Sequence, residues 1–218
     1  MGRLVEVADT KLYVEERGEP SAFPLLVFHG GPGLDHTEFG DYLDPLAEGG
    51  SYRLVLVDER ACGRSDRTAP RGTWTLGRMA QDVSDLAASL GVRGGYATLG
   101  HSYGAFVVLQ HAVDHSGEPR GTVVSSGMAA ARWLGGVDRQ LAAFEPAELR
   151  AQVTSSWARE REVRTEDEAA ALLDDQLPFP LPGAARRCAD GVPAPHRRAR
   201  PVRPGRHPPL CRAGLRGD

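Results

Sequence analysis

The chain has 218 residues, of which 26 are Lys or Arg and 29 are Asp or Glu, and its net charge is -3. This length allows one domain with a substantial core, and no apolar run is long enough to span a membrane. The first eleven residues lack the apolar segment of a secretory signal, and the three cysteines fit neither a disulfide framework nor a zinc site. We therefore expect a cytoplasmic protein with no membrane partner, no metal and no cofactor.

The first part of the chain alternates between predicted strands and predicted helices. Residues 11–16 alternate in character and predict an edge strand. Four later runs are nearly continuous in apolar residues, which is typical of strands buried on both faces of a parallel sheet. These runs are residues 24–29, 53–57, 96–100 and 121–125. Helical periodicity at 76–90 and 105–113 lies between them, and the alternation predicts an α/β fold with a mainly parallel sheet.

After Gly127 the pattern changes to helices alone. Pro146 stands where the first turn of a helix tolerates proline, and Thr165–Glu168 has the pattern of a capping box. We therefore predict a core over residues 1–127 and a separate helical region over 128–182.

The pentapeptide Gly100-His-Ser-Tyr-Gly104 follows a predicted buried strand and precedes a predicted helix. This is the context of a nucleophile elbow, which would make Ser102 the nucleophile. The turn is sharp, and a side chain at Gly100 or Gly104 would clash with the neighbouring strand or helix. The turn would also place the hydroxyl near a helix N-terminus, which favours developing negative charge. The alternative is an ordinary strand-to-helix turn with glycine caps.

The segment His29-Gly-Gly-Pro-Gly33 directly follows the first buried strand. Glycines there let the backbone approach a ligand and present an amide. An acyl-transfer enzyme needs two donors around its tetrahedral oxygen, and we assign the amides of Gly31 and Tyr103 to this role. His29, Gly30 and Gly33 would support the loop, although a plain Gly/Pro turn is the alternative.

A third segment, Asp58–Ser65, follows the second buried strand. We interpret its charged residues, Asp58 and Arg60 among them, as structural support for the loop over the site rather than as catalytic groups.

These three segments, in this order and spacing, resemble the α/β-hydrolase superfamily, and more closely the proline iminopeptidase (prolyl aminopeptidase) family. The resemblance covers about residues 5–182 and departs from the family at Ala61, where the family loop usually has glycine. It implies an α/β-hydrolase fold with a helical cap, which residues 128–182 would form. In the family, acidic cap residues bind the free α-amine of the substrate. Glu160 or Glu162 would take that role here, but a second Trp of the family pattern is absent, and a solvated helix face is the alternative.

A serine nucleophile needs a base, and the base needs an orienting acid. In this fold the acid and then the His follow the serine along the chain. The candidates after residue 182 are Asp190, His196, His207 and Asp218, and none follows an apolar strand. We expect His101 to point away from Ser102, and His111 and His115 to serve packing of the following helix. The triad acid and His are therefore not identified, and the C-terminal strands of the fold are predicted to be missing.

Residues 183–218 differ sharply in composition from the rest. They carry nine Arg and two Asp without any Phe, Trp or Tyr, whereas residues 1–182 carry 17 Lys and Arg against 27 Asp and Glu. Such a segment cannot bury enough apolar surface to fold, so we expect disorder. The chain has one Lys against 25 Arg, as GC-rich genes give, and our hypothesis is a frameshift near residue 182. A genuine tail that binds nucleic acid is the alternative, disfavoured because no aromatic residues are interleaved.

We therefore expect a serine hydrolase that acts through an acyl-enzyme and releases the N-terminal residue of a small peptide. An esterase, amidase or lactonase on the same scaffold is the second hypothesis, because a fold does not fix the substrate. The third is a truncated hydrolase fragment without catalytic activity.

Overall fold

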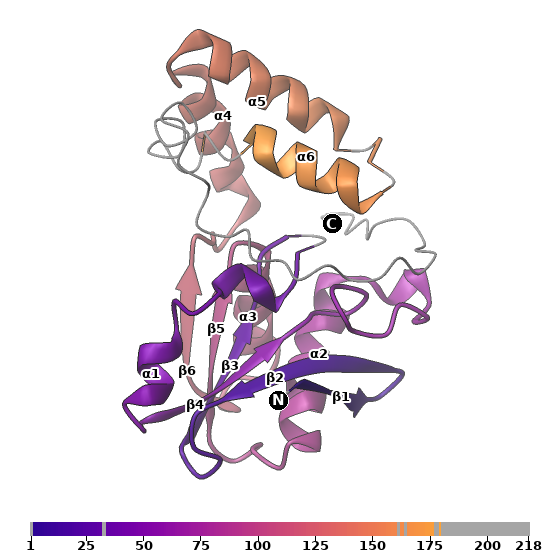
Figure 1. Ribbon diagram of the computed structural model, residues 1–218, viewed down its shortest axis with the longest axis vertical. Helices are drawn as coiled ribbons and strands as arrows, with labels where there is room; N and C mark the ends of the chain where they lie inside the picture. Colours follow the sequence, from indigo (N-terminus) through magenta and orange to yellow (C-terminus); the bar gives the residue numbers. More distant parts are fainter. Residues whose placement is uncertain (1, 32–33, 161, 164, 177–178, 180–218) are drawn as a thin grey trace. The chain divides into compact units, whose positions relative to one another are not determined.

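A computed structural model describes residues 2–31, 34–160, 162–163, 165–176 and 179 (Figure 1). The described residues form two compact units, one that ends at Ala129 and one that begins at Ala130. The core and cap boundaries drawn from the sequence remain predictions. The predicted tail, residues 183–218, lies outside the described residues.

The first unit is built on a six-stranded sheet with the order β1-β2-β4-β3-β5-β6. The strands are β1 (Gly2–Val7), β2 (Thr10–Arg17), β3 (Phe23–Phe28), β4 (Tyr52–Val57), β5 (Tyr96–His101) and β6 (Pro119–Ser125). β2 pairs antiparallel with β1 and β4, and all the other pairs are parallel. The prediction of an α/β fold with a mainly parallel sheet is confirmed.

Helices cover both faces of this sheet (Figure 1). On one face α2 (Leu76–Ser89) and α3 (Tyr103–Asp114) bury residues such as Val83 and Val107 against Phe28 and Val55. On the other face α1 (Asp44–Glu48) and the 3₁₀ helix η1 (His36–Phe39) pack over Leu54 and its neighbours. A short 3₁₀ helix, η2 (Arg71–Thr73), precedes α2. The carboxyl ends of β3, β4 and β5 therefore lie side by side between two helical layers.

The prediction that residues 11–16 form an edge strand is wrong. These residues lie in β2, which is paired on both sides, and β1 is the edge strand. The hairpin turn between them, Ala8-Asp9, has none of the glycines that usually reveal a two-residue turn in a sequence. Because the sequence gives no clear signal for β1, the following strand is predicted to lie at the edge of the sheet.

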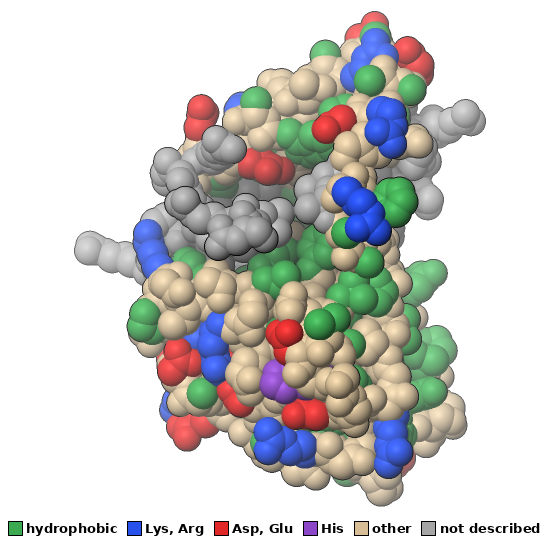
Figure 2. Space-filling view, turned by 180° about the vertical axis from the view of Figure 1, so that it is seen from behind, with side chains coloured by type: hydrophobic (Ala, Val, Ile, Leu, Met, Phe, Trp, Pro, Cys, Tyr) green, Lys and Arg blue, Asp and Glu red, His purple; other side chains and the backbone are tan. Residues whose placement is uncertain are grey.

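The strand predicted at 121–125 exists as β6, but it is not buried on both faces. Within the described residues β6 pairs only with β5, so it forms the other edge of the sheet. Val123 and Val124 are 51% and 40% exposed. Hydrophobic side chains are accordingly visible on the flank where the sheet ends (Figure 2). The apolar pattern predicted the strand correctly, whereas burial depends on a neighbour that the pattern does not report.

The second unit is helical, as predicted. It contains η3 (Ala131–Trp133), α4 (Leu134–Ala142), α5 (Ala147–Arg159) and α6 (Glu166–Gln176). Pro146 stands immediately before α5. The predicted capping box is confirmed, because the Glu168 amide donates to Thr165 Oγ1 at 3.2 Å and the Thr165 amide donates to the Glu168 carboxylate at 3.0 Å. Among the helices described, none combines the length and the apolar character needed to cross a bilayer.

Candidate active site

Ser102 occupies the turn between β5 and α3 with a strained backbone. Its φ of 52° and ψ of −110° are values that L side chains rarely adopt. The flanking glycines are required by packing, as the sequence argument predicted. A Cβ on Gly100 would lie 2.7 Å from Ala105 N, and one on Gly104 would lie 2.6 Å from His29 O. The turn can therefore form only where no side chain projects from either glycine.

The turn is fixed by backbone hydrogen bonds on both sides of Ser102. The Ser102 amide donates to Ser125 O in β6 at 2.9 Å, and the Gly104 amide donates to His29 O at 3.0 Å. Among the described residues, none forms a hydrogen bond with the Ser102 hydroxyl, and the side chain is half-buried. Helix α3 therefore starts directly against the end of β3.

His29 is fully buried and holds the loop after β3 in one orientation. The Glu59 amide donates to His29 Nε2 at 3.0 Å, so the ring proton must lie on Nδ1. Nδ1 then donates to Gly30 O at 2.6 Å. Because the peptide bond is trans and planar, the Gly31 amide on the same peptide points the opposite way from this carbonyl. Burial lowers the pKa of His29, which agrees with a neutral ring.

The loop and the elbow meet at Gly30. A Cβ on Gly30 would lie 3.1 Å from Ser102 Cβ and 3.0 Å from Glu38 Oε1. Gly31 has a φ of 134°, which favours glycine. Of the predicted site residues, the structure thus brings Gly30 and Ser102 into contact, while Gly33 lies outside the described residues.

Two residues that the sequence argument did not assign to the site lie at this junction. The Gly30 amide donates to Glu38 Oε2 at 2.5 Å, and the other carboxylate oxygen bonds to His101 Nδ1. The His101 ring also meets the ring of Phe39 edge to face at 6.5 Å. His101, expected only to point away from Ser102, is thus engaged by Glu38. No local pattern marks this pair, because its members are 63 positions apart in the sequence.

The pKa values at this junction follow from burial and hydrogen bonding. Burial alone would raise the pKa of Glu38, but the hydrogen bonds from His101 and from the Gly30 amide bring it below its ordinary value. The same bond to Glu38 raises the pKa of His101 and outweighs the opposing effect of burial. An ionised Glu38 therefore faces a His101 that readily holds a proton.

The Asp58–Ser65 segment braces the adjacent loop. Asp58 is fully buried, and its carboxylate accepts hydrogen bonds at 2.8 Å from the amides of His36 and Arg64. His36 Nδ1 adds a bond of 2.5 Å. Ala61, which stands where the resembling family usually has glycine, has a φ of 61°, so this L residue occupies the left-handed region.

Arg60 is fully buried and links this segment to the body of the unit. It forms two hydrogen bonds with Asp82, at 2.8 and 2.7 Å, and also bonds with Asp9 and Thr73. Asp58 and Arg60 thus make contacts within the scaffold, in agreement with a supporting role.

A metal could be considered only where ligand atoms gather. Among the described residues, Asp35, His36 and Asp58 bring such atoms within 4.8 Å of one another. These atoms already bond to protein: Asp58 to His36 and Arg64, and Asp35 to the amide and hydroxyl of Thr37. The cluster is a closed hydrogen-bond network.

Glu59 is buried beside His29, and its Oε1 has no hydrogen-bond partner among the described residues. Burial, with the nearby charges of Glu38 and Asp82, raises the pKa of Glu59 well above its ordinary value. Burial without a hydrogen-bond partner for Oε1 thus favours the protonated form of this carboxyl group.

The remaining candidates lie away from Ser102 or in the second unit. His111 bonds to Tyr96 Oη at 2.8 Å and stacks on His115, so both histidines serve packing around α3. Glu160 accepts a hydrogen bond from Gln176 at 2.9 Å, and Glu162 is exposed. Their predicted role as amine binders stays a prediction.

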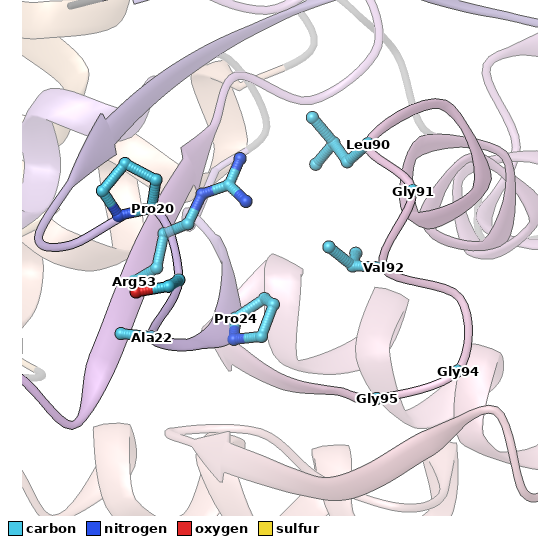
Figure 3. A pocket seen from close by; sticks show the side chains of 10 residues that line it. Pro20, Ala22, Pro24, Arg53, Leu90, Gly91, Val92, Gly94 and Gly95 are labelled. Atoms are coloured by element: carbon cyan, nitrogen blue, oxygen red, sulfur yellow. The ribbon is translucent and has the colours of Figure 1, made fainter.

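A surface pocket of about 450 Å³ lies at the opposite end of the sheet (Figure 3). It is lined by Pro20 and its neighbours in the turn before β3, by Pro24 at the start of β3, by Arg53, and by the turn after α2 from Leu90 to Gly95. Because Ser102 follows the carboxyl end of β5, this pocket is not part of the candidate site.

Comparison with known proteins agrees with this architecture. Residues 24–175 match the family model described as the alpha/beta hydrolase fold, and the chain belongs to this family. Proline iminopeptidase from Saccharolobus solfataricus is 32% identical over 108 residues, which are 49% of this chain and 34% of that protein. The chain spans between about a third and just over half the length of the curated relatives it matches.

Solved structures show the same fold. A proline iminopeptidase from Mycobacterium smegmatis aligns with a TM-score of 0.62 and 23% identity, over 88% of this chain and 69% of that one. An epoxide hydrolase from Vigna radiata aligns with a TM-score of 0.51 and 28% identity, over 56% of this chain and 38% of that one. The α/β-hydrolase fold with a mostly parallel sheet, predicted from the sequence, is confirmed.

Proposed function

We propose that the chain carries the acylation site of a serine hydrolase, with Ser102 as the nucleophile. The observation that carries this proposal is the backbone of Ser102, which is strained between two glycines that cannot bear a side chain. Strain of this kind persists where the surrounding structure enforces it, and it clusters at active sites.

In the proposed reaction, the Ser102 hydroxyl attacks the carbonyl carbon of an ester or amide. The oxygen of the resulting tetrahedral intermediate carries the negative charge, and the amides of Gly31 and Tyr103 donate hydrogen bonds to it. The carbonyl re-forms as the bond to the leaving alcohol or amine breaks, and that group takes up the proton released by Ser102. Water then attacks the acyl-enzyme, which releases the acid and restores the Ser102 hydroxyl. The hydroxyl proton requires a base, and no described residue accepts a hydrogen bond from Ser102.

The proposed substrate is a peptide from which the N-terminal residue, proline above all, is released. Support comes from the likeness to the proline iminopeptidase of Saccharolobus solfataricus at 32% identity, over 49% of this chain and 34% of that relative. An esterase, amidase or lactonase is the second candidate. The likeness to an epoxide hydrolase supports retaining this second candidate, because proteins of this fold catalyse different reactions.

Labelling with a fluorophosphonate, read by mass spectrometry, tests the site directly. The native chain should be labelled at Ser102, whereas Ser102→Ala should not be labelled and Ser21→Ala, at an exposed serine, should match the native chain. Triad-deficient serine hydrolases keep roughly 10³–10⁴-fold acceleration over water, so slow labelling would still support the proposal. No difference between the native chain and Ser102→Ala would instead indicate an inactive hydrolase fragment.

The substrate is tested by comparing a prolyl-arylamide with a short-chain acyl ester. Faster Ser102-dependent release from the prolyl-arylamide supports the aminopeptidase proposal. Turnover of the ester alone would replace it with the esterase candidate.

A further inference from the structure

Glu38 contacts both segments on which the proposed function depends. One carboxylate oxygen accepts the Gly30 amide, and the other binds the ring of His101, which directly precedes Ser102. We infer that Glu38 is a positioning residue that joins the loop after β3, which carries the proposed oxyanion donor Gly31, to the nucleophile elbow at Ser102, and so holds the Gly31 amide beside Ser102. The inference rests on the proposed function, in which that amide stabilises the oxyanion.

The two peptide planes on either side of Gly30 Cα are each held by one side chain. Glu38 binds the amide of the plane between His29 and Gly30 at 2.5 Å. His29 binds the carbonyl of the plane between Gly30 and Gly31 at 2.6 Å. With both planes fixed, the φ and ψ of Gly30 are fixed, although glycine has the widest backbone freedom of all residues. The direction of the Gly31 amide follows from these two bonds.

Gly30 cannot be replaced by a residue that would hold this geometry through its own side chain. A Cβ there would lie 3.1 Å from Ser102 Cβ and 3.0 Å from Glu38 Oε1. The close approach that places the loop against Ser102 therefore requires glycine, and the rigidity that glycine lacks is supplied by Glu38 from the neighbouring helix η1. The side chain of Glu38 is 19% exposed, so little water competes for its oxygens.

The charge of Glu38 also needs a partner, because a lone carboxylate beside Ser102 would disfavour an oxyanion. The titratable groups that face Glu38 are His101, His29 and Glu59. Glu59 is a carboxyl group and cannot carry positive charge, and His29 accepts a hydrogen bond at Nε2, so its ring is neutral. His101 is therefore the group that can supply positive charge. The bond to Glu38 raises the pKa of His101. As the pH rises through that raised value the neutralising charge is lost, and acylation of Ser102 should slow.

This pH dependence is opposite to that of a catalytic histidine base, which works only when it is deprotonated. A rate that falls at higher pH, in a chain with Glu38 intact, is therefore a signature of the positioning pair. A purely structural role of Glu38 in folding would leave the pH profile of the correctly folded fraction unchanged.

The structural arm of the test is ¹⁵N NMR of the full chain. In Glu38→Ala the Gly30 amide proton should move upfield because its carboxylate acceptor is lost, and the Gly31 amide should shift as well. In Glu38→Gln, which keeps an acceptor without charge, the titration midpoint of His101 should fall. Glu48→Ala, at an exposed carboxylate on α1, should change none of these signals. Unchanged Gly31 and His101 signals in both Glu38 variants would overturn the inference.

The kinetic arm measures Ser102 acylation by a p-nitrophenyl ester as a function of pH. Because small displacements of a catalytic group cost up to about 100-fold, Glu38→Ala should lower kcat by about 10- to 100-fold with little change in KM. Glu38→Gln should remove the decline at high pH. Equal rates and equal pH profiles in the native chain and Glu38→Gln would count against the inference. If the native chain and Ser102→Ala do not differ at all, the proposed function fails, and the NMR signals alone decide whether Glu38 positions the loop.

Discussion

Replacement of Ser102 by glycine should stabilise the folded chain, whereas replacement by alanine should leave its stability nearly unchanged. The φ of 52° and ψ of −110° cost an L residue about 1–3 kcal/mol. Glycine adopts them freely but gains about 0.5–1 kcal/mol of backbone freedom in the unfolded chain. Because no described residue bonds to the Ser102 hydroxyl, alanine keeps the strain and loses no hydrogen bond.

The difference between the two variants isolates the backbone strain. Ser102→Gly should exceed Ser102→Ala in free energy of unfolding by about 0.5–2 kcal/mol, measured by urea unfolding with circular dichroism. At about 2–4 °C per kcal/mol for a chain of this size, the gain should also be visible as a higher Tm. A matched glycine in ordinary helix, Ala88→Gly at an exposed position of α2, should instead lose about 1 kcal/mol. A Ser102→Gly variant less stable than Ser102→Ala would refute the strain argument.

Two further predictions concern buried charges near the loops. Arg60→Met should lower the free energy of unfolding by about 3–5 kcal/mol, because Asp82 stays buried with only Arg78 to neutralise it. The double variant with Asp82→Leu should recover most of that loss in urea unfolding, and an equal loss would contradict the reasoning. Burial and nearby carboxylates raise the pKa of Glu59 in the folded chain. The stability that this side chain contributes is therefore fully present below the unfolded pKa and is lost as pH rises through the folded pKa. The glutamine in Glu59→Gln does not titrate, so the free energy of unfolding of this variant relative to the native chain should rise with pH, by at most about 1.4 kcal/mol per pH unit. A constant difference between pH 5 and 9 would show that Glu59 does not titrate abnormally.

The parallel strands and the elbow could be predicted because their signals are local. Strands buried on both faces, such as β3 and β4, need apolar residues at nearly every position. The elbow needs glycine at two exact positions, for the steric reasons that the close contacts of Gly100 and Gly104 demonstrate. The apolar residues of a buried strand and the glycines of the elbow each lie within a few positions of one another, so a short stretch of sequence is enough to predict either feature.

The place of β2 and the burial of β6 could not be predicted in the same way. Both depend on what lies beside the strand, and a strand's own residues do not determine its neighbours. β1 supplies the missing partner of β2 through a turn without glycine. β6 has the apolar residues of an interior strand, yet within the described residues it has one partner only. Its exposed valines follow from strand order and not from composition.

The candidate site lies between these two cases. His29 directly follows β3, Glu59 lies just after β4 and His101 ends β5, and these three strands are adjacent in the order β4-β3-β5. The hydrogen bonds that orient the loop with Gly30 and Gly31 therefore come from strand ends that meet only because of this order. The sequence shows the glycines that permit the close approach, since their need is local. It does not show the contacts of Glu38, because the two segments that Glu38 joins become neighbours only when the sheet forms.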